Sequence, residues 1–170
     1  TLAAGNSQDA IGGAVVLRSG SSTTTSSGSV DISTGDAGTS GQSGRITLTT
    51  GNATDGAAGD FRVVTGSSQD GRGGDVMFSV GAGETNLQGG SIALYAGDSS
   101  DGSGGSISLV SGSGSATSSG DIVVQTASAG TAGDSGALTL TTGVATDGQS
   151  GALTIGTGEA NFADSGAVSI

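Results

Sequence analysis

The feature that most constrains the fold is a short repeat whose opening glycines stand fifteen or sixteen positions apart. Each repeat has apolar residues at its third and fifth positions, and each of the ten complete repeats has a closing residue at the eighth, which is glycine in all but one (Ala127), and then a polar loop. The longer spacing is every third one. A fixed period of this kind is typical of a stacked repeat protein. The opening positions are Gly13, Gly28, Gly44, Gly59, Gly74, Gly90, Gly105, Gly120, Gly136, Gly151 and Gly166.

The two apolar slots of every repeat hold only Val, Ile, Leu or Phe. Spacing by two is the pattern of a strand with one buried face, and glycine at such short intervals excludes a helix. We therefore predict an all-β fold whose core is formed by these side chains. They are Val15, Leu17, Val30, Ile32, Ile46, Leu48, Phe61, Val63, Val76, Phe78, Ile92, Leu94, Ile107, Leu109, Ile122, Val124, Leu138, Leu140, Leu153, Ile155, Val168 and Ile170.

Two geometries of a β-solenoid (parallel β-helix) fit this repeat. A strand of about seven residues spans roughly 20 Å, which the polar loop can just return, so one repeat could form one coil. Three repeats together span 46 residues, and residues 13–58 match residues 105–150 at 25 positions, so a triangular coil of three repeats is the alternative. An antiparallel meander is a third choice, which the length of the loops disfavours because hairpins usually close with shorter turns.

We predict a single repeat domain over residues 1–170. It contains eleven strand units that open at Gly13 through Gly166, preceded by a partial N-terminal unit. Because the pattern starts and stops in mid-repeat, we expect a fragment of a longer repeat array. No stretch approaches the roughly 18 to 20 apolar residues of a transmembrane helix, so we predict no membrane insertion.

The residue types that the chain lacks restrict its chemistry. The sequence has no Cys and no His, which removes thiolate nucleophiles, disulfides, common metal ligands and the commonest general base. All but one of its carboxylates lie in the recurring loops or beside opening glycines, the exception being Asp31, and none stands apart as a cluster. We predict that the chain is not an enzyme. A net charge of −11 also makes nucleic acid a poor partner.

The loops carry Asp-Gly pairs and small residues. We expect the glycines to supply positive φ angles at tight corners, and each Asp before a Gly to cap its own turn. The second loop residue is small in every loop, which indicates a close-packed corner. These residues are Ser22, Ala37, Ala53, Ser68, Gly83, Ser99, Gly114, Ala129, Ala145 and Ala160.

Four loop carboxylates, Asp9, Asp55, Asp101 and Asp147, are each 46 residues apart. In the triangular geometry they would stack at about 4.8 Å, the spacing between neighbouring strands. A carboxylate column repels itself unless each Asp caps its turn or a cation such as Ca²⁺ bridges the column. Calcium-binding repeats of the RTX type have a nine-residue period, from which this chain departs. Both interpretations stay open, and no other cofactor is predicted.

Two further surface functions are indicated by short motifs. Asn52 with Thr54 forms the N-x-[ST] pattern of N-glycosylation in a loop. The pairs Thr47 with Thr49 and Thr139 with Thr141 resemble in part the flat Thr-x-Thr ladders of insect antifreeze proteins. The same outward slots elsewhere hold Asp, Arg, Met, Tyr and Gln, which would interrupt such a ladder.

Apolar residues also occupy strand positions that alternation points away from the core. An exposed apolar set of this kind often marks an interface, so we predict an assembly face. Its members are Val16, Val64, Met77, Tyr95, Val110 and Val123.

The whole chain, with its Gly, Ser and Thr-rich loops around short aliphatic segments, resembles in style the extracellular β-solenoid repeat proteins of surface, fibre and adhesin type. The resemblance rests on no diagnostic motif and transfers no functional residues. It implies a structural segment of an extracellular fibre, sheath or cell-surface protein that associates with itself or with neighbouring repeats. The alternative is a β-solenoid that binds ice, or one that binds glycans or surfaces as an adhesin does.

Overall fold

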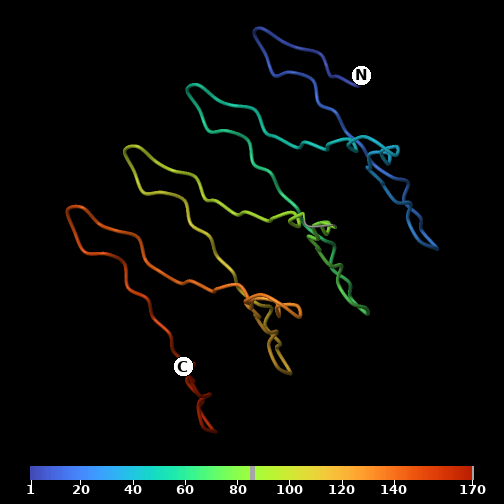
Figure 1. Cartoon of the computed structure of the whole chain (residues 1–170). Helices are drawn as coiled ribbons and strands as arrows, with labels where there is room; N and C mark the ends of the chain where they lie inside the picture. The colour runs from blue at the N-terminus through green and yellow to red at the C-terminus, as the bar shows by residue number, and fades with distance from the viewer. Residues whose placement is uncertain (85–86, 170) are drawn as a thin grey trace. The chain divides into compact units, whose positions relative to one another are not determined.

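The computed structural model describes residues 1–84 and 87–169 (Figure 1). Over these residues the chain has no helix and no β-strand, so the prediction of an all-β solenoid is wrong. The reason lies in how the backbone hydrogen bonds are distributed. A strand needs a ladder of successive bonds to a neighbouring segment. In the described residues each backbone hydrogen bond instead closes one loop and is not followed by another.

Bends recur along the chain with the period of the sequence repeat. In every described loop a bend of three residues begins three residues after the closing position, or four in the longer repeats. The polar loops are therefore where the chain reverses, and the apolar segments run between reversals. The bends are at residues 8–10, 23–25, 39–41, 54–56, 69–71, 100–102, 115–117, 131–133, 146–148 and 161–163.

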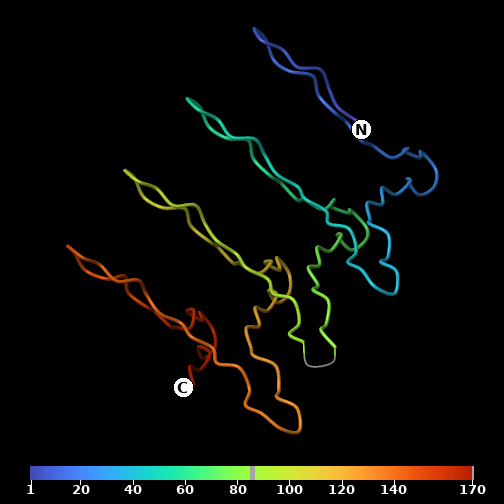
Figure 2. The same cartoon turned by 45° about the horizontal axis from the view of Figure 1, so that its top comes forward.

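The chain divides into two units, Thr1–Ser79 and Val80–Ile170. In the first unit, the loops that bend at 8–10 and 54–56 lie on the same side in both views (Figures 1 and 2). In the second unit, the loops that bend at 100–102 and 146–148 share a side in the same way. Within each unit, loops 46 residues apart in the chain thus point in one direction. The single repeat domain stays a prediction.

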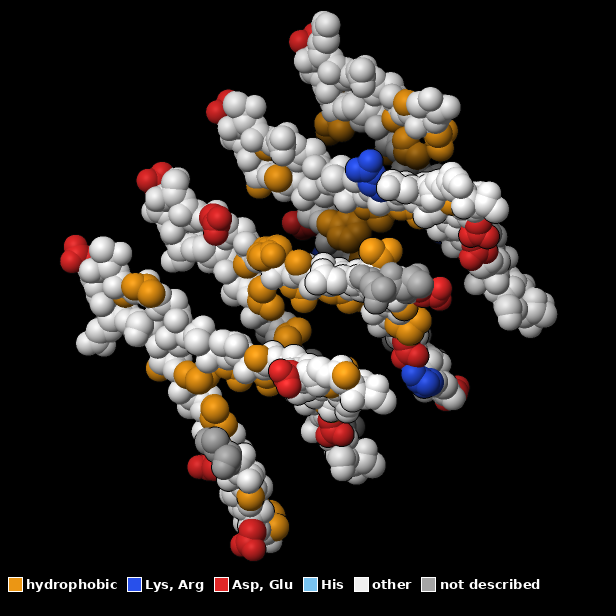
Figure 3. Space-filling model, viewed as in Figure 1, with side chains coloured by type: hydrophobic (Ala, Val, Ile, Leu, Met, Phe, Trp, Pro, Cys, Tyr) orange, Lys and Arg blue, Asp and Glu red, His pale blue; other side chains and the backbone are white. Residues whose placement is uncertain are grey.

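The predicted core is not formed in the part of the chain that the structure describes. Of its members, Ile170 lies outside the described residues, and the others are exposed by 48% at Val30 to 77% at Phe78. No described side chain is buried. Each segment contributes only two apolar side chains of the predicted core, and no second segment covers them. Figure 3 shows them lying open along the segments, while several acidic side chains lie at the ends of loops.

The total surface measures how far the chain is from covering its own apolar residues. It exposes 16812 Å². A folded monomer of this mass exposes about 7,300 Å², and the fully unfolded chain about 23,000 Å². The excess over a folded monomer is therefore about 9,500 Å². One chain by itself thus has the loops of a repeat protein without the core of one.

Candidate functional site

The residue before each loop (the closing position) and the glycine after it (the opening position) face each other. We call this pair of positions the neck of the loop and name each neck by their two numbers, closing position first. At six necks the N–H of the opening glycine donates to the carbonyl of the closing glycine eight or nine positions earlier, at 2.9 to 3.4 Å. These six are 5–13, 20–28, 66–74, 81–90, 97–105 and 112–120. The neck, with its loop, is the recurring ordered element of the molecule.

The opening glycine allows a close approach at six of the eleven necks, where an added Cβ would lie 3.4 Å or less from an atom across the neck, whereas at the other five it would make an ordinary contact. A Cβ placed on Gly105 would lie 3.3 Å from the Cβ of Ala96, the residue before closing Gly97. The same relation holds at all eleven necks, where the nearest side chain to the opening glycine belongs to the residue before the closing position. A side chain at the opening position would therefore collide with its partner at the tightest necks. Closing Gly97, in contrast, has open space where a Cβ would stand.

The facing residue determines how tightly the neck closes. The neck bond is 2.9 Å at the four necks where that residue is Ala or Ser, and 3.3 to 3.4 Å where it is Val80 or Thr65. At the other five described necks it is threonine, and no backbone bond forms there within 3.5 Å. A β-branched side chain presents an extra methyl or hydroxyl toward the opening glycine and holds the two backbones apart. At neck 35–44 the Thr34 hydroxyl instead donates to the Gly44 carbonyl at 3.2 Å.

Serine hydroxyls stabilise several bends. The Oγ of Ser7 accepts from the N–H of Ala10, and that of Ser99 accepts from Gly102, at 3.0 and 2.9 Å. Ser22 accepts from both Thr24 and Thr25. These serines occupy the small second loop position, so in these loops that position supplies a turn-capping hydroxyl.

Two predictions about the loops are wrong over the described residues. No Asp before a Gly accepts a bond from a backbone N–H of its own turn there; Asp101 accepts only from the side-chain hydroxyl of neighbouring Ser100, at 3.0 Å. Among the described glycines, positive φ occurs only at Gly133, with φ of 121°. The loops have seven or eight residues between their flanking positions, so they reverse gradually and do not need left-handed corners.

All four residues of the predicted cation ladder lie in bends. Asp9, Asp55, Asp101 and Asp147 each occupy the middle residue of a bend and are exposed. The described residues contain no group of three or more acidic side chains that could hold a metal ion. The Ca²⁺ site therefore stays a prediction from the sequence. Asn52, also exposed, follows closing Gly51 and precedes the bend at 54–56, so the glycosylation site is accessible but untested.

The predicted assembly face is the most exposed part of the apolar segments. Its six members are exposed by 74 to 91%, with Tyr95 highest. The predicted inward positions range from 48 to 77%. The alternation that the sequence indicates therefore persists as a difference in exposure, although neither set is buried. The Thr-x-Thr pairs, in turn, form no flat ladder in the described residues, because a ladder requires the strands that are absent there.

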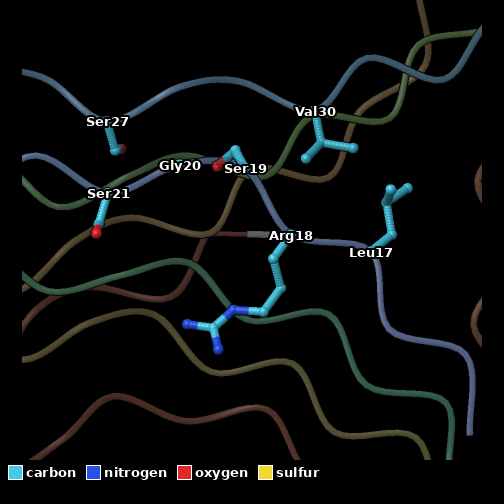
Figure 4. A pocket seen from close by; sticks show the side chains of 7 residues that line it. All are labelled: Leu17, Arg18, Ser19, Gly20, Ser21, Ser27 and Val30. Carbon is cyan, nitrogen blue, oxygen red and sulfur yellow. The ribbon is translucent and has the colours of Figure 1, made fainter.

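A shallow hollow of about 340 Å³ lies beside neck 20–28 (Figure 4). Leu17 and Val30 come to it from the two sides of the loop, and the Arg18 side chain extends away from both of them. Its remaining walls are serines and the neck glycine. The hollow offers one cation and several hydroxyls at an open surface, without the convergent polar groups of a ligand pocket.

One ion pair lies next to a neck. The Arg72 guanidinium donates to both carboxylate oxygens of Asp75, at 2.7 and 2.5 Å, just after opening Gly74. The two side chains are 80% and 73% exposed, so solvent weakens the pair and it adds little to stability.

Comparisons with known proteins identify no relative. No family model, curated protein or solved structure matches the chain. Over the described residues there is also no helix long and apolar enough to cross a membrane. Function is therefore argued from the residues alone.

Proposed function

We propose that the chain is a structural repeat segment of an extracellular fibre, sheath or surface protein, and that copies associate through their apolar segments. The observation that carries this proposal is the uncovered apolar surface. Every described residue of the predicted core and of the assembly face is at least 48% exposed. Burial of apolar surface contributes about 25 cal/mol per Å², so an ordered segment of this kind is stabilised when another copy covers it.

The exposed surface of one copy is large enough for interfaces with several other copies. The excess over a folded monomer, about 9,500 Å², is several times the roughly 1,200 to 2,000 Å² that a standard protein interface buries. A repeat protein whose units each leave the same surface open is suited to extended assembly, because every added copy offers that surface again.

The distribution of charge supports the same proposal. Of the 15 carboxylates, 11 lie in the polar loops, and the apolar segments carry few charges. In Figure 3 several acidic side chains lie at the ends of loops, and others lie beside apolar side chains. Copies that associate through the segments therefore leave most of the charge in solvent, where it is not desolvated. The extracellular location follows from the resemblance in style described above.

The test is the state of the intact chain in solution. We expect sedimentation velocity to show species larger than the 15.7 kDa chain that grow with concentration. Electron microscopy of the same sample should show elongated assemblies. A species of 15.7 kDa at every concentration, with a radius of gyration near the ~15 Å of a compact domain, would overturn the proposal. It would mean that one chain buries its own apolar residues.

A further inference from the structure

We infer that copies pair in parallel along their extended segments with a stagger of 46 residues, so that residues 47–170 of one copy lie against residues 1–124 of the next. This inference rests on the proposed self-association and specifies its register. The occupant of the open segments is thus a second copy of this chain, and the pairing is between chains.

The backbone of the segments is open to pairing over the described residues. In the described residues, backbone-to-backbone hydrogen bonds occur only at the six necks. The segments between necks are extended, and their N–H and C=O groups find no backbone partner in that part of the chain. An extended segment with open edges on both sides is a template for pairing with another extended chain. Such pairing satisfies the backbone and covers the apolar side chains at the same time.

The loops restrict the register of such pairing. Bends begin at positions 8, 23, 39, 54 and 69, and the same intervals return from position 100 to position 161. Because the longer loop recurs every third time, a displacement by one or two repeats leaves some segments one residue out of step. A slip of one residue moves outward side chains to the inward face. Displacements by multiples of 46 residues keep every opening glycine aligned, as with Gly13, Gly59, Gly105 and Gly151. Displacements of zero and 46 pair the most residues, 170 and 124, whereas a displacement of 92 pairs only 78.

Repulsion between carboxylates favours a displacement of 46 residues over a displacement of zero. With no stagger, each of the 15 carboxylates faces its own counterpart. With a stagger of 46, acid faces acid at four places only, and each arginine faces an uncharged residue. Like charges opposite one another destabilise paired segments. The four remaining acidic pairs are Asp9 with Asp55, Asp55 with Asp101, Asp101 with Asp147, and Asp75 with Asp121.

Growth beyond a dimer follows from the two open edges of each copy. A pair uses one edge of each copy and leaves the other edge free for a further copy in the same register. With a stagger of 46 residues, every added copy is displaced in the same direction. The result is an open, head-to-tail assembly instead of a closed one.

The experiment uses the absence of cysteine from the sequence. Thr47, Arg62 and Ala93 each stand three residues after an opening glycine and are exposed, so single cysteines can be placed at equivalent positions. We mix full-length chains carrying Thr47→Cys and Ala93→Cys, oxidise them during association, and identify the linked peptides by mass. A mixture of Thr47→Cys with Arg62→Cys is the matched control for a displacement by a single repeat.

We expect the 47-to-93 link to exceed both the 47-to-47 and the 47-to-62 links by about tenfold, which corresponds to about 1.4 kcal/mol. A dominant 47-to-47 link would show an unstaggered pair and overturn the inference. Equal yields of the three links would show association without register and also overturn it. Sedimentation of the same samples separates these outcomes from failure of the proposed function: if the variants and the unmodified chain all remain monomeric, both proposals fail, whereas association with another link removes only the stagger.

Discussion

The loops and the apolar segments of this molecule differ in what orders them. The loops contain the neck bonds and the serine-capped bends, all made between residues at most ten positions apart. The segments have strong strand-like alternation but make no ladder within the described chain. Local contacts thus order the loops, whereas the described segments have no partner within the chain. In the proposed function the repeat specifies spacing within a chain, and contacts between copies supply the cohesion.

The largest expected effect comes from replacing apolar side chains by serine in a segment and comparing the result with the same replacement in the loops. The double variant Leu138→Ser, Leu140→Ser removes both apolar slots of one segment. Each buried leucine contributes about 1.5 to 3 kcal/mol, so we expect the dissociation constant of assembly to rise about 100-fold or more. The measurement is sedimentation velocity over a concentration series.

The matched control removes apolar side chains from loops. Val144 and Phe162 are fully exposed loop residues, so Val144→Ser with Phe162→Ser should leave association unchanged. Equal weakening by the loop pair and the segment pair would remove the distinction between the two regions.

Salt should strengthen association, because it screens the repulsion between the acidic loops of neighbouring copies. The net charge of −11 opposes the approach of copies, and most of that charge lies in the loops. Raising ionic strength from about 0.01 to 0.15 M shortens the screening length from about 30 Å to about 8 Å. We expect the association constant to rise by roughly tenfold, measured by light scattering. Association that weakens with salt would instead show that ion pairs between copies drive assembly.

A smaller effect concerns the neck itself. Gly105→Ala places a Cβ 3.2 Å from the backbone nitrogen of Gly97, so the neck must widen and its 2.9 Å bond weakens. A backbone hydrogen bond contributes about 0.5 to 1.5 kcal/mol net, so hydrogen exchange at the residue 105 amide should accelerate about 2- to 10-fold. Gly97→Ala, which meets open space, is the control. If both variants exchange alike, the opening glycine is not a steric requirement.

The smallest effect tests the facing residue. Thr50→Ala removes the β-branched side chain opposite Gly59, at a neck where no backbone bond forms in the described chain. We expect the neck to close and exchange at the Gly59 amide to slow by about twofold. The reverse change, Ala96→Thr, should accelerate exchange at Gly105. Unchanged exchange in both variants would show that side-chain branching does not set the neck width.

The sequence predicts the period and the positions of the loops well, because the neck bonds and the serine caps join residues that are close together in the chain. It also predicts which apolar residues are more sheltered: Val30 is exposed by 48%, against 91% for Tyr95. The ladder and the core were predicted wrongly because alternation shows that a segment is able to pair, but not that a partner lies in the same chain. Whether Asp9 or Asp55 binds a cation stays a prediction for the same reason, since its ligands would have to come from elsewhere.

The role of the neck was missed, although the sequence contains a signal for it. The opening position is always glycine, and the residue before the closing position is always Ala, Ser, Thr or Val, as in the pair Gly105 and Ala96. A glycine that always faces a small residue about nine positions earlier indicates close contact between two backbones. The prediction treated each glycine only as a residue that supplies a positive φ angle, and so it missed the contact across the neck. Among the described glycines, only Gly133 has a positive φ.

The necks have a mechanical consequence. A loop held at its base contributes almost nothing to the length of the chain under tension, since tension is carried across the neck. If a neck such as 97–105 opens, the eight peptide units that it bypasses become available, and each adds about 3.3 to 3.6 Å of extension. One opened neck therefore gains roughly 26 to 29 Å less the width of the closed neck, while only one weak bond is lost. A filament of the proposed kind built from such chains would lengthen in steps as its necks open one by one.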